Sequence, residues 1–423
     1  MSKSLLKTSE AKMRNKIRFV QNGQIRELEN VDPNQTVLNF LRYEDAQTGS
    51  KEGCAEGDCG ACTVVLGELK GDEVQYQAVN ACIQFLPMID GKELITVENL
   101  KSDDGHLHPV QQAMVDANAT QCGFCTPGFV MSIFAEAQGK ARSDLQSIND
   151  VLAGNLCRCT GYGTIIEAAR NAVTSDTSSH FQARKTLTAE LLSELANDEM
   201  LATSGANNQF FAPTTTSELV QLLDTHPEAT ILAGATDIGL WVTKKHERLQ
   251  TLIYIGQIKE LKQISDEGDF IRVGAGVSYS EAWEILQSLS SDLGELIRRI
   301  ASTQIRNSGT IGGNIANGSP IGDTPPALIA LNATLNLQSS KGVRSIALED
   351  FFIEYGKQDL LSGEFVASVD IPKIQAQQRF RTYKISKRFD QDISALCAAY
   401  SLRLEGNTVA TYAFAMAEWP EHL

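Results

Sequence analysis

The sequence has no run of about 18 apolar residues, the length that a membrane-spanning helix needs, so no segment is predicted to cross a bilayer. Its opening residues, MSKSLLKTSEAKMRNK, contain lysines but no apolar stretch, so we expect no secretory signal peptide and a cytoplasmic location. Positive charge is also scarce, because 37 Lys and Arg residues face 52 Asp and Glu residues and leave a net charge of −15. A nucleic-acid partner is therefore not expected, since phosphate contacts need a basic surface.

Cysteine is nearly absent after residue 159, where Cys397 alone remains, in an apolar run that predicts a buried core residue. The other eight cysteines lie between residues 54 and 159. In a protein that is not exported they are not expected to form disulfides, because the cytosol keeps thiols reduced. The chain of 423 residues is long enough for roughly three domains. Because eight of the nine cysteines lie in the first third of the chain, that third is expected to have a chemistry of its own.

The first cysteine group has the spacing C-x4-C-x2-C followed by a distant fourth residue, and consists of Cys54, Cys59, Cys62 and Cys82. This is the plant-type [2Fe–2S] pattern. A structural zinc site is the alternative, but zinc ligands usually come in C-x2–4-C pairs, whereas three cysteines here crowd one glycine-rich loop. The flanking residues 17–97 predict strands, one helix and a hairpin turn at Asn22-Gly23, as in a β-grasp ferredoxin.

The second cysteine group, C-x2-C followed by C-x-C, consists of Cys122, Cys125, Cys157 and Cys159. Taken alone, four thiolates in this pattern fit either zinc or an iron–sulfur cluster. Their surroundings have helical periodicity, with Thr126 and Pro127 as a predicted N-cap and first helical residue. We expect both cysteine pairs to lie where the helices of a small four-helix bundle meet.

The rest of the chain predicts a connector and then an α/β region. The connector contains one short helix, and Ser217 is a candidate cap for a helix beyond it. Two glycine-rich turns, at residues 234–239 and 309–314, offer free amides to an anionic pyrophosphate, although ordinary tight turns remain an alternative. Neither is G-x-G-x-x-G and neither has a P-loop lysine, which argues against a Rossmann nucleotide site. No histidine pairs with a nucleophile pattern, so no catalytic residue is assigned.

Taken together, the motifs resemble a known family. KEGCAEGDCGACTV with Cys82, QCGFCTPGFVMS with GNLCRCTGY, LAGATDIG, and STQIRNSGTIGGNIANGSPIGDTPPAL resemble the iron–sulfur and FAD subunit of the molybdenum hydroxylase family, in its xanthine dehydrogenase form. The resemblance implies a [2Fe–2S] cluster at both cysteine groups. It also implies a flavin domain of the vanillyl-alcohol oxidase type, which accounts for the missing G-x-G-x-x-G.

The resemblance implies an α+β multidomain chain with five segments. They are a β-grasp [2Fe–2S] ferredoxin-like domain at 15–97, a four-helix-bundle [2Fe–2S] domain at 98–175, a linker at 176–208, an FAD-binding domain at 209–372, and a partial flavoprotein C-terminal domain at 378–423. In the family this last domain continues for tens of residues, so we expect a truncation that exposes a sheet face and weakens FAD binding.

The resemblance also implies the residues that hold FAD. The pyrophosphate would lie against Ile231, Leu232, Ala233, Gly234, Ala235, Thr236, Asp237 and Ile238, with Thr310, Ile311, Gly312, Gly313 and Asn314 as the second wall. Asp323 would lie near the adenosine half, and Lys384 beside the isoalloxazine ring, where a cation stabilises reduced flavin. One position departs from the family, because Ile300 stands where an aromatic residue often stacks on the flavin.

The function implied by the resemblance is electron transfer. A molybdopterin-binding large subunit would oxidise hypoxanthine or xanthine, and electrons would pass through the bundle cluster, the ferredoxin-like cluster and FAD to NAD+. The two chains would form a heterotetramer. A relative acting on aldehydes, carbon monoxide or another heterocycle remains an alternative, as does a zinc-stabilised scaffold without enzymatic activity.

Overall fold

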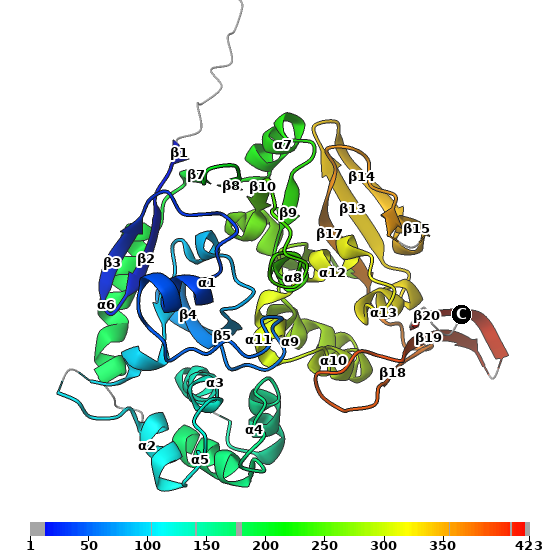
Figure 1. Ribbon diagram of the computed structural model, residues 1–423. Helices are drawn as coiled ribbons and strands as arrows, with labels where there is room; N and C mark the ends of the chain where they lie inside the picture. The colour runs from blue at the N-terminus through cyan, green and yellow to red at the C-terminus, as the bar shows by residue number, and fades with distance from the viewer. Residues whose placement is uncertain are drawn as a thin grey trace, which may run out of the picture.

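The computed structural model describes residues 13–102, 104–139, 142–174, 180–354, 356–406 and 408–418. Figure 1 shows a β-grasp sheet beside a bundle of short helices, both packed against a larger α/β region that ends in a three-stranded sheet. Within the described residues, no helix combines the length and the apolar character that crossing a membrane requires.

The ferredoxin-like sheet has the strand order β3-β2-β6-β4-β5. Its strands are β2 (Ile17–Gln21), β3 (Gln24–Leu28), β4 (Thr63–Lys70), β5 (Glu73–Asn80) and β6 (Glu93–Ile95). Asn22 and Gly23 both have positive φ, at 54° and 69°, which matches the right-handed twist of a two-residue hairpin and confirms the predicted turn. Helix α1 (Val37–Asn39) continues into a π-helical turn (Phe40–Glu44) that buries Phe40 and Leu41.

The bundle consists of α2 (Pro109–Asp116), α3 (Thr126–Gln138), α4 (Leu145–Leu152) and α5 (Gly163–Thr174). The apolar faces of these helices meet in one core with Phe129, Ile133 and Phe134 fully buried. The predicted start of α3 was wrong by one residue. Cys125 is the N-cap and Thr126 the first helical residue, which leaves Pro127 in the first turn, where its missing N–H costs no hydrogen bond.

The described part of the segment predicted as a linker, residues 180–208, packs against the rest of the fold. Helix α6 (His180–Leu195) lies along the ferredoxin-like sheet, where Leu192 and Leu195 are buried with Val20 (Figure 1). The hydroxyl of Thr188 donates to the buried carboxyl of Glu93, 3.3 Å away. The end of the same segment forms β7 (Met200–Ser204), which belongs to the following sheet.

We call residues 200–372 the α/β domain. Its first sheet has the order β1-β7-β8-β10-β9, in which β1 (Met13–Arg14) is an edge strand from the N-terminal part of the chain. The other strands beyond β7 are β8 (Gln209–Ala212), β9 (Thr230–Leu232) and β10 (Thr251–Tyr254). Two helices cross between these strands, α7 (Thr216–Thr225) and α8 (Ile238–Thr243). The predicted cap at Ser217 was wrong, because Thr215 caps α7 and Glu218 completes the reciprocal capping box.

A second, antiparallel sheet has the order β11-β12-β17-β13-β14. These strands are β11 (Ile264–Asp266), β12 (Phe270–Gly274), β13 (Thr334–Ser339), β14 (Gly342–Ala347) and β17 (Phe365–Pro372). Five helices lie between its strands in sequence: α9 (Tyr279–Leu289), α10 (Ser291–Arg298), α11 (Thr303–Ser308), α12 (Ile311–Asn317) and α13 (Thr324–Ala330). A small hairpin pairs β15 (Phe352–Glu354) with β16 (Lys357–Gln358).

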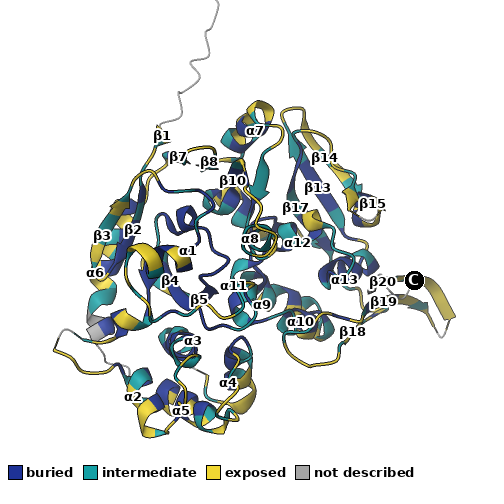
Figure 2. Cartoon of the chain, viewed as in Figure 1, coloured by how far each residue is buried: buried dark blue, intermediate teal, exposed yellow. Residues whose placement is uncertain are grey.

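The C-terminal sheet consists of β18 (Gln378–Ile385), β19 (Leu396–Glu405) and β20 (Thr408–Glu418). One face packs on α13 and buries Phe380, Cys397 and Ala399 with the core of the α/β domain. The prediction that Cys397 is buried is confirmed. The opposite face is exposed (Figure 2), and its apolar side chains are Tyr383, Ile385, Tyr400, Leu402, Tyr412, Phe414 and Met416.

Candidate redox-cofactor sites

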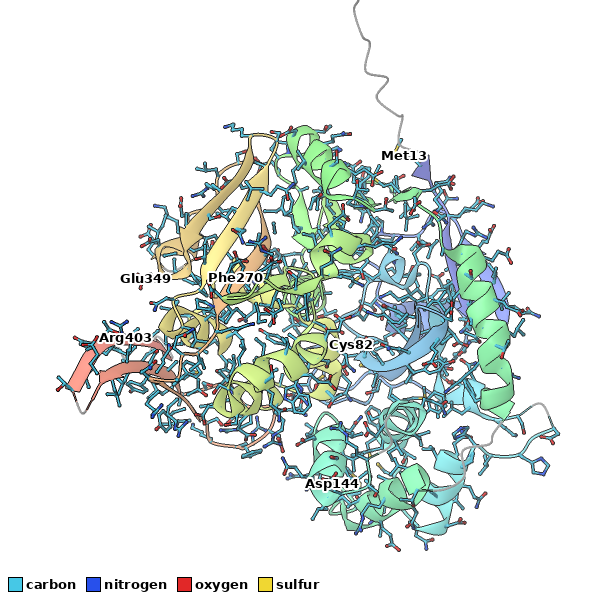
Figure 3. All side chains as sticks on the ribbon, turned by 180° about the vertical axis from the view of Figure 1, so that it is seen from behind. Met13, Cys82, Asp144, Phe270, Glu349 and Arg403 are labelled. Atoms are coloured by element: carbon cyan, nitrogen blue, oxygen red, sulfur yellow. The ribbon has the colours of Figure 1, made fainter. Side chains whose placement is uncertain are left out.

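The first thiol group lies at one end of the β4–β5 hairpin. Cys54, Cys59 and Cys62 stand in the loop before β4, which we call the first thiol loop (residues 53–62), and Cys82 follows β5 directly. Cys54 Sγ accepts hydrogen bonds from the backbone amides of Glu56 and Cys59, at 3.5 and 3.3 Å. The thiols of Cys59 and Cys82 also donate to Cys54, which lowers its pKa. Figure 3 labels Cys82 near the centre of the molecule, and its side chain packs in one apolar cluster with Leu232 and Ala235 of the α/β domain.

The second thiol group lies where three bundle helices meet. Cys125 caps α3, Cys122 precedes it, and Cys157 and Cys159 stand in the turn between α4 and α5. Cys157 Sγ lies 3.2 Å from Thr160 Oγ1 and accepts from the Thr160 amide at 3.5 Å. Burial raises the pKa of Cys125 to about 12, with its thiol paired to Cys157. Cys122 and Cys159 are exposed, so this group reaches the protein surface.

Both thiol groups suit a binuclear cluster. Four cysteine thiolates hold the two irons of a [2Fe–2S] cluster, whose potential depends on hydrogen bonds to sulfur. The amides directed at Cys54 and Cys157 supply such bonds. The thiols and the amides directed at them therefore fit a [2Fe–2S] cluster.

The two glycine-rich segments face one another across a cavity of about 300 Å³ between the two sheets of the α/β domain. Of the predicted FAD residues, those lining it are Ile231, Ala233, Gly234, Ala235, Thr236, Asp237, Ile238, Thr310, Gly312, Gly313 and Asn314. Leu232 and Ile311 do not line it, because their side chains are buried in the adjoining cores. A cavity of this size, with mixed apolar and backbone lining, is typical of a cofactor site.

Glycine is required where the two segments touch. A Cβ on Gly234 would lie 1.9 Å from the carbonyl oxygen of Ser308, so only glycine lets the segments meet backbone to backbone. A Cβ on Gly313 would point toward the opposite wall, 3.8 Å from Ala233 Cβ and 2.8 Å from Thr310 Oγ1. The second segment is not the simple turn that the sequence suggested, because Thr310 caps α12 by accepting from the Gly313 amide at 2.9 Å.

Asp323 and Lys384 lie outside this cavity and contact each other. Lys384 Nζ donates to Asp323 Oδ2 at 2.6 Å and to Ser394 Oγ at 2.8 Å, and Ser394 donates to Asp323 Oδ1 at 2.5 Å. The two charged side chains are only 3% and 9% exposed. The resemblance assigns them to opposite halves of the dinucleotide, whereas the structure brings them together. The pair joins β18 to the residue that precedes α13.

Several residues of the cavity were not expected from the sequence. Tyr279, Trp241 and Val366 line it without belonging to either motif. Tyr279 donates or accepts a hydrogen bond with Thr324, 3.2 Å away, and burial raises its pKa. Trp241 could have been found, since it follows Ile238 by one helical turn; the others come from distant elements. Ile300 is not among the residues that line the cavity, and its carbonyl accepts from Arg306 Nη1 at 2.8 Å.

The two thiol groups and the cavity are joined by direct contacts. The amide of Leu156, next to Cys157, donates to the carbonyl of Cys59 at 3.0 Å, so the two thiol groups are linked through one hydrogen bond. Gln84, two residues beyond Cys82, donates to Ser308 Oγ at 3.1 Å and to the Gly234 carbonyl at 3.4 Å. The first thiol group therefore lies between the bundle and the cavity.

Three domain families match the chain. A "2Fe-2S iron-sulfur cluster binding domain" matches residues 19–86, a "[2Fe-2S] binding domain" matches residues 96–170, and an "FAD binding domain in molybdopterin dehydrogenase" matches residues 206–374. Each match covers one of the sites described above. The chain thus contains two [2Fe–2S] domains and an FAD-binding domain, as predicted.

Relatives with known names differ in substrate. Xanthine dehydrogenase of Drosophila pseudoobscura pseudoobscura is 33% identical over 94% of this chain and 34% of that protein, and aldehyde oxidase 1 of Rattus norvegicus is 33% identical over 84% and 31%. The chain spans about a third of the length of the curated relatives it matches. A solved carbon monoxide dehydrogenase from Hydrogenophaga pseudoflava is 29% identical, with a TM-score of 0.47 over 49% of this chain and 73% of that one.

Proposed function

We propose that this chain, which comprises the iron–sulfur and FAD region of a molybdenum hydroxylase, carries electrons from a partner molybdenum centre to NAD+. The observation that carries the proposal is the unbroken contact between the three cofactor sites, from the bundle through the first thiol loop to the cavity. When bound, the clusters supply one-electron transfer and FAD exchanges electron pairs with a nicotinamide. The chain itself contributes ligation, spacing and exclusion of water.

The order in which electrons pass between the cofactors follows from how exposed the cysteines of the two thiol groups are. Cys122 and Cys159 are exposed, whereas Cys62 and Cys82 are buried. The bundle group therefore faces a partner, and the first thiol loop is the internal relay. The eight thiolates of the two groups are the proposed cluster ligands, and the residues lining the cavity between the two sheets are the proposed FAD ligands. A molybdopterin-binding large subunit docked on the bundle, in a heterotetramer, would complete the enzyme.

The substrate class belongs to the partner subunit. Xanthine dehydrogenases of several species are among the relatives, at up to 33% identity, and the sequence motifs resemble that form, so hypoxanthine or xanthine is the first candidate. Aldehyde oxidases match at a similar identity, so an aldehyde-oxidising partner is the second candidate. We assign the oxidation of the purine or aldehyde to the partner subunit and to no residue of this chain.

The test compares the chain with and without its partner. The purified chain should be brown, should contain iron, sulfide and flavin, and should oxidise NADH with an artificial electron acceptor. It should not oxidise xanthine, because purine chemistry needs the molybdenum centre, and adding the large subunit should restore that activity. Stoichiometric zinc without iron, or rapid xanthine oxidation by the isolated chain, would refute the proposal. Restored turnover of aldehydes but not of purines would select the second candidate.

A further inference from the structure

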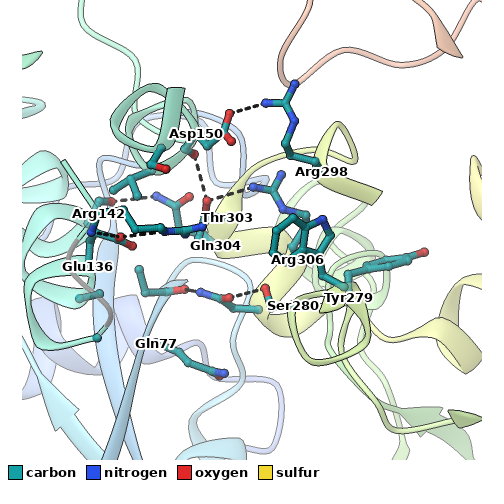
Figure 4. A pocket seen from close by; sticks show the side chains of 18 of the residues that line it. Gln77, Glu136, Arg142, Asp150, Tyr279, Ser280, Arg298, Thr303, Gln304 and Arg306 are labelled. Atoms are coloured by element: carbon teal, nitrogen blue, oxygen red, sulfur yellow. Dashed lines mark hydrogen bonds and ion pairs between the residues drawn. The ribbon is translucent and has the colours of Figure 1, made fainter. Parts of the chain in front are cut away.

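Gln304 is a fully buried polar residue where the three domains meet. It lies on α11 of the α/β domain, is 1% exposed, and extends toward the bundle and the first thiol loop (Figure 4). Its Nε2 lies 3.1 Å from Ser132 Oγ, 3.2 Å from Asn155 Oδ1 and 3.3 Å from Thr63 Oγ1. Ser132 belongs to α3, and Thr63 follows Cys62 directly. One side chain of the flavin-binding domain thus contacts both cluster domains.

The partners of Gln304 require a donor at this position. The Ser132 hydroxyl already donates to Asn155 Oδ1 at 2.7 Å, and the Thr63 hydroxyl donates to the Gly60 carbonyl at 2.6 Å. The Ser132 oxygen is therefore left as an acceptor whose donor is the Gln304 amide, whereas Asn155 Oδ1 already accepts from Ser132 and Thr63 Oγ1 also accepts from Asn155 Nδ2 at 3.4 Å. Buried acceptors left without a donor cost about 1–3 kcal/mol each. The side chain is consequently held in one orientation.

Asn155 transmits this contact to both thiol groups. Its Nδ2 donates to the Gly60 carbonyl at 3.1 Å, which also accepts from the Thr63 amide at 3.0 Å. Gly60 stands between Cys59 and Cys62, and Asn155 stands two residues before Cys157. A Cβ on Gly60 would lie 2.0 Å from the Gly154 carbonyl, so the two segments pack without side chains between them. Rotation of the Asn155 side chain would break this hydrogen bond between the two thiol-bearing segments.

Gln304 is also close in sequence to the flavin cavity. The six residues of α11 lead to Thr310, and the Ser308 hydroxyl donates back to the Gln304 carbonyl at 3.2 Å. Ser308 in turn contacts Gly234 on the opposite wall of the cavity. A displacement at Gln304 therefore reaches the wall that faces the proposed FAD.

We propose that Gln304 is a positioning residue for electron transfer: through Asn155 its amide fixes the two thiol groups relative to each other and to the flavin cavity. This inference rests on the proposed function, because it assigns a role within the same relay. It makes Gln304 neither a cluster ligand nor a flavin ligand. Its removal should change the geometry between cofactors and leave the cofactors bound.

The experiment compares two variants of nearly unchanged volume. Gln304→Met removes the amide, and Gln304→Glu at neutral pH places carboxylate oxygens against three acceptors. Both should retain the iron and flavin content of the parent chain. In the dithionite-reduced protein, the magnetic interaction between the two clusters, seen as splitting of their EPR signals, should change in Gln304→Met and change more in Gln304→Glu. Reduction of the clusters by NADH in stopped-flow experiments should slow several-fold.

Asn307→Ala is the matched control. Asn307 lies on the same helix and donates to the Ala78 carbonyl of β5 at 2.9 Å, so its loss weakens the same domain contact without touching either thiol group. This variant should be less stable yet keep the parental EPR splitting. Unchanged splitting in Gln304→Met with cofactors retained would overturn the inference and leave the proposed function standing. A parent chain without iron or flavin would overturn the proposed function instead. Gln304→Met decides the question if Gln304→Glu does not fold.

Discussion

Lys384→Met tests whether this lysine is a flavin contact or one half of a buried ion pair. In the structure Lys384 Nζ lies 2.6 Å from Asp323 Oδ2, with both side chains nearly inaccessible to water. Methionine keeps the apolar stem and removes the charge, so Asp323 is left buried with Ser394 as its remaining side-chain donor. Removing one partner of a buried pair costs about 3–5 kcal/mol, because the other charge is left uncompensated. We expect a loss of that size in the free energy of unfolding.

Two further variants isolate the ion pair. Lys384→Met combined with Asp323→Asn removes both charges and should recover most of the lost stability, which gives a coupling energy in a double-mutant cycle. The exposed pair of Lys357 with Glu354 has a similar separation of 3.0 Å, but its side chains are 61% and 64% exposed. Lys357→Met should therefore cost less than about 1 kcal/mol.

The assay is urea unfolding followed by tryptophan fluorescence, since Trp241 and Trp283 both lie in the α/β domain. The flavin absorption spectrum of each variant is recorded in parallel. If Lys384 pairs with Asp323, the single variant unfolds at lower urea and the double variant regains most of the difference. A shifted flavin spectrum with less than about 1 kcal/mol of destabilisation, the surface-pair range, would refute the ion-pair interpretation and favour contact with the ring.

Three other perturbations test the sites directly. Gly313→Val places a branched side chain between Thr310 and Ala233 and should lower flavin content while iron is retained; full flavin would move the site out of this cavity. Cys157→Ser should abolish one EPR signal and keep the other, because the two thiol groups lie in separate domains, and loss of both signals in soluble protein would contradict that partition. Burial raises the pKa of Glu93 to about 7 from its ordinary 4.5. The folded chain then binds this proton more tightly than the unfolded chain, so stability should fall as pH rises from 4.5 to above 7, by at most about 3 kcal/mol. Glu93→Gln should flatten the dependence measured by unfolding at pH 6 and pH 8, and an unchanged slope would exclude Glu93 as its source.

Much of the site chemistry is readable in the sequence because its residues are local. Cys54, Cys59 and Cys62 lie in one loop, and each pair of the second group is separated by one or two residues, so spacing alone predicts ligation. The Asn22-Gly23 hairpin is local for the same reason. The N-cap of a helix was harder to predict where several neighbouring residues have a similar capping propensity. The run Thr214 to Ser217 contains four capping residues, and the structure selects Thr215, whose hydroxyl accepts from the Glu218 amide.

Long-range contacts were decided by the tertiary structure. Helix α6 looked like a polar connector because its burial depends on Val20, more than 150 residues earlier, and on other strands of the ferredoxin-like sheet. Lys384 and Asp323 lie 61 residues apart, and nothing near either one shows that the other neutralises it. Gln304 is 149 residues from Asn155 and 241 from Thr63. The sequence by itself determined which side chains are suited to hold cofactors. Only the folded chain decided how those groups are spaced, because their separation depends on buried hydrogen bonds between residues that local patterns do not relate.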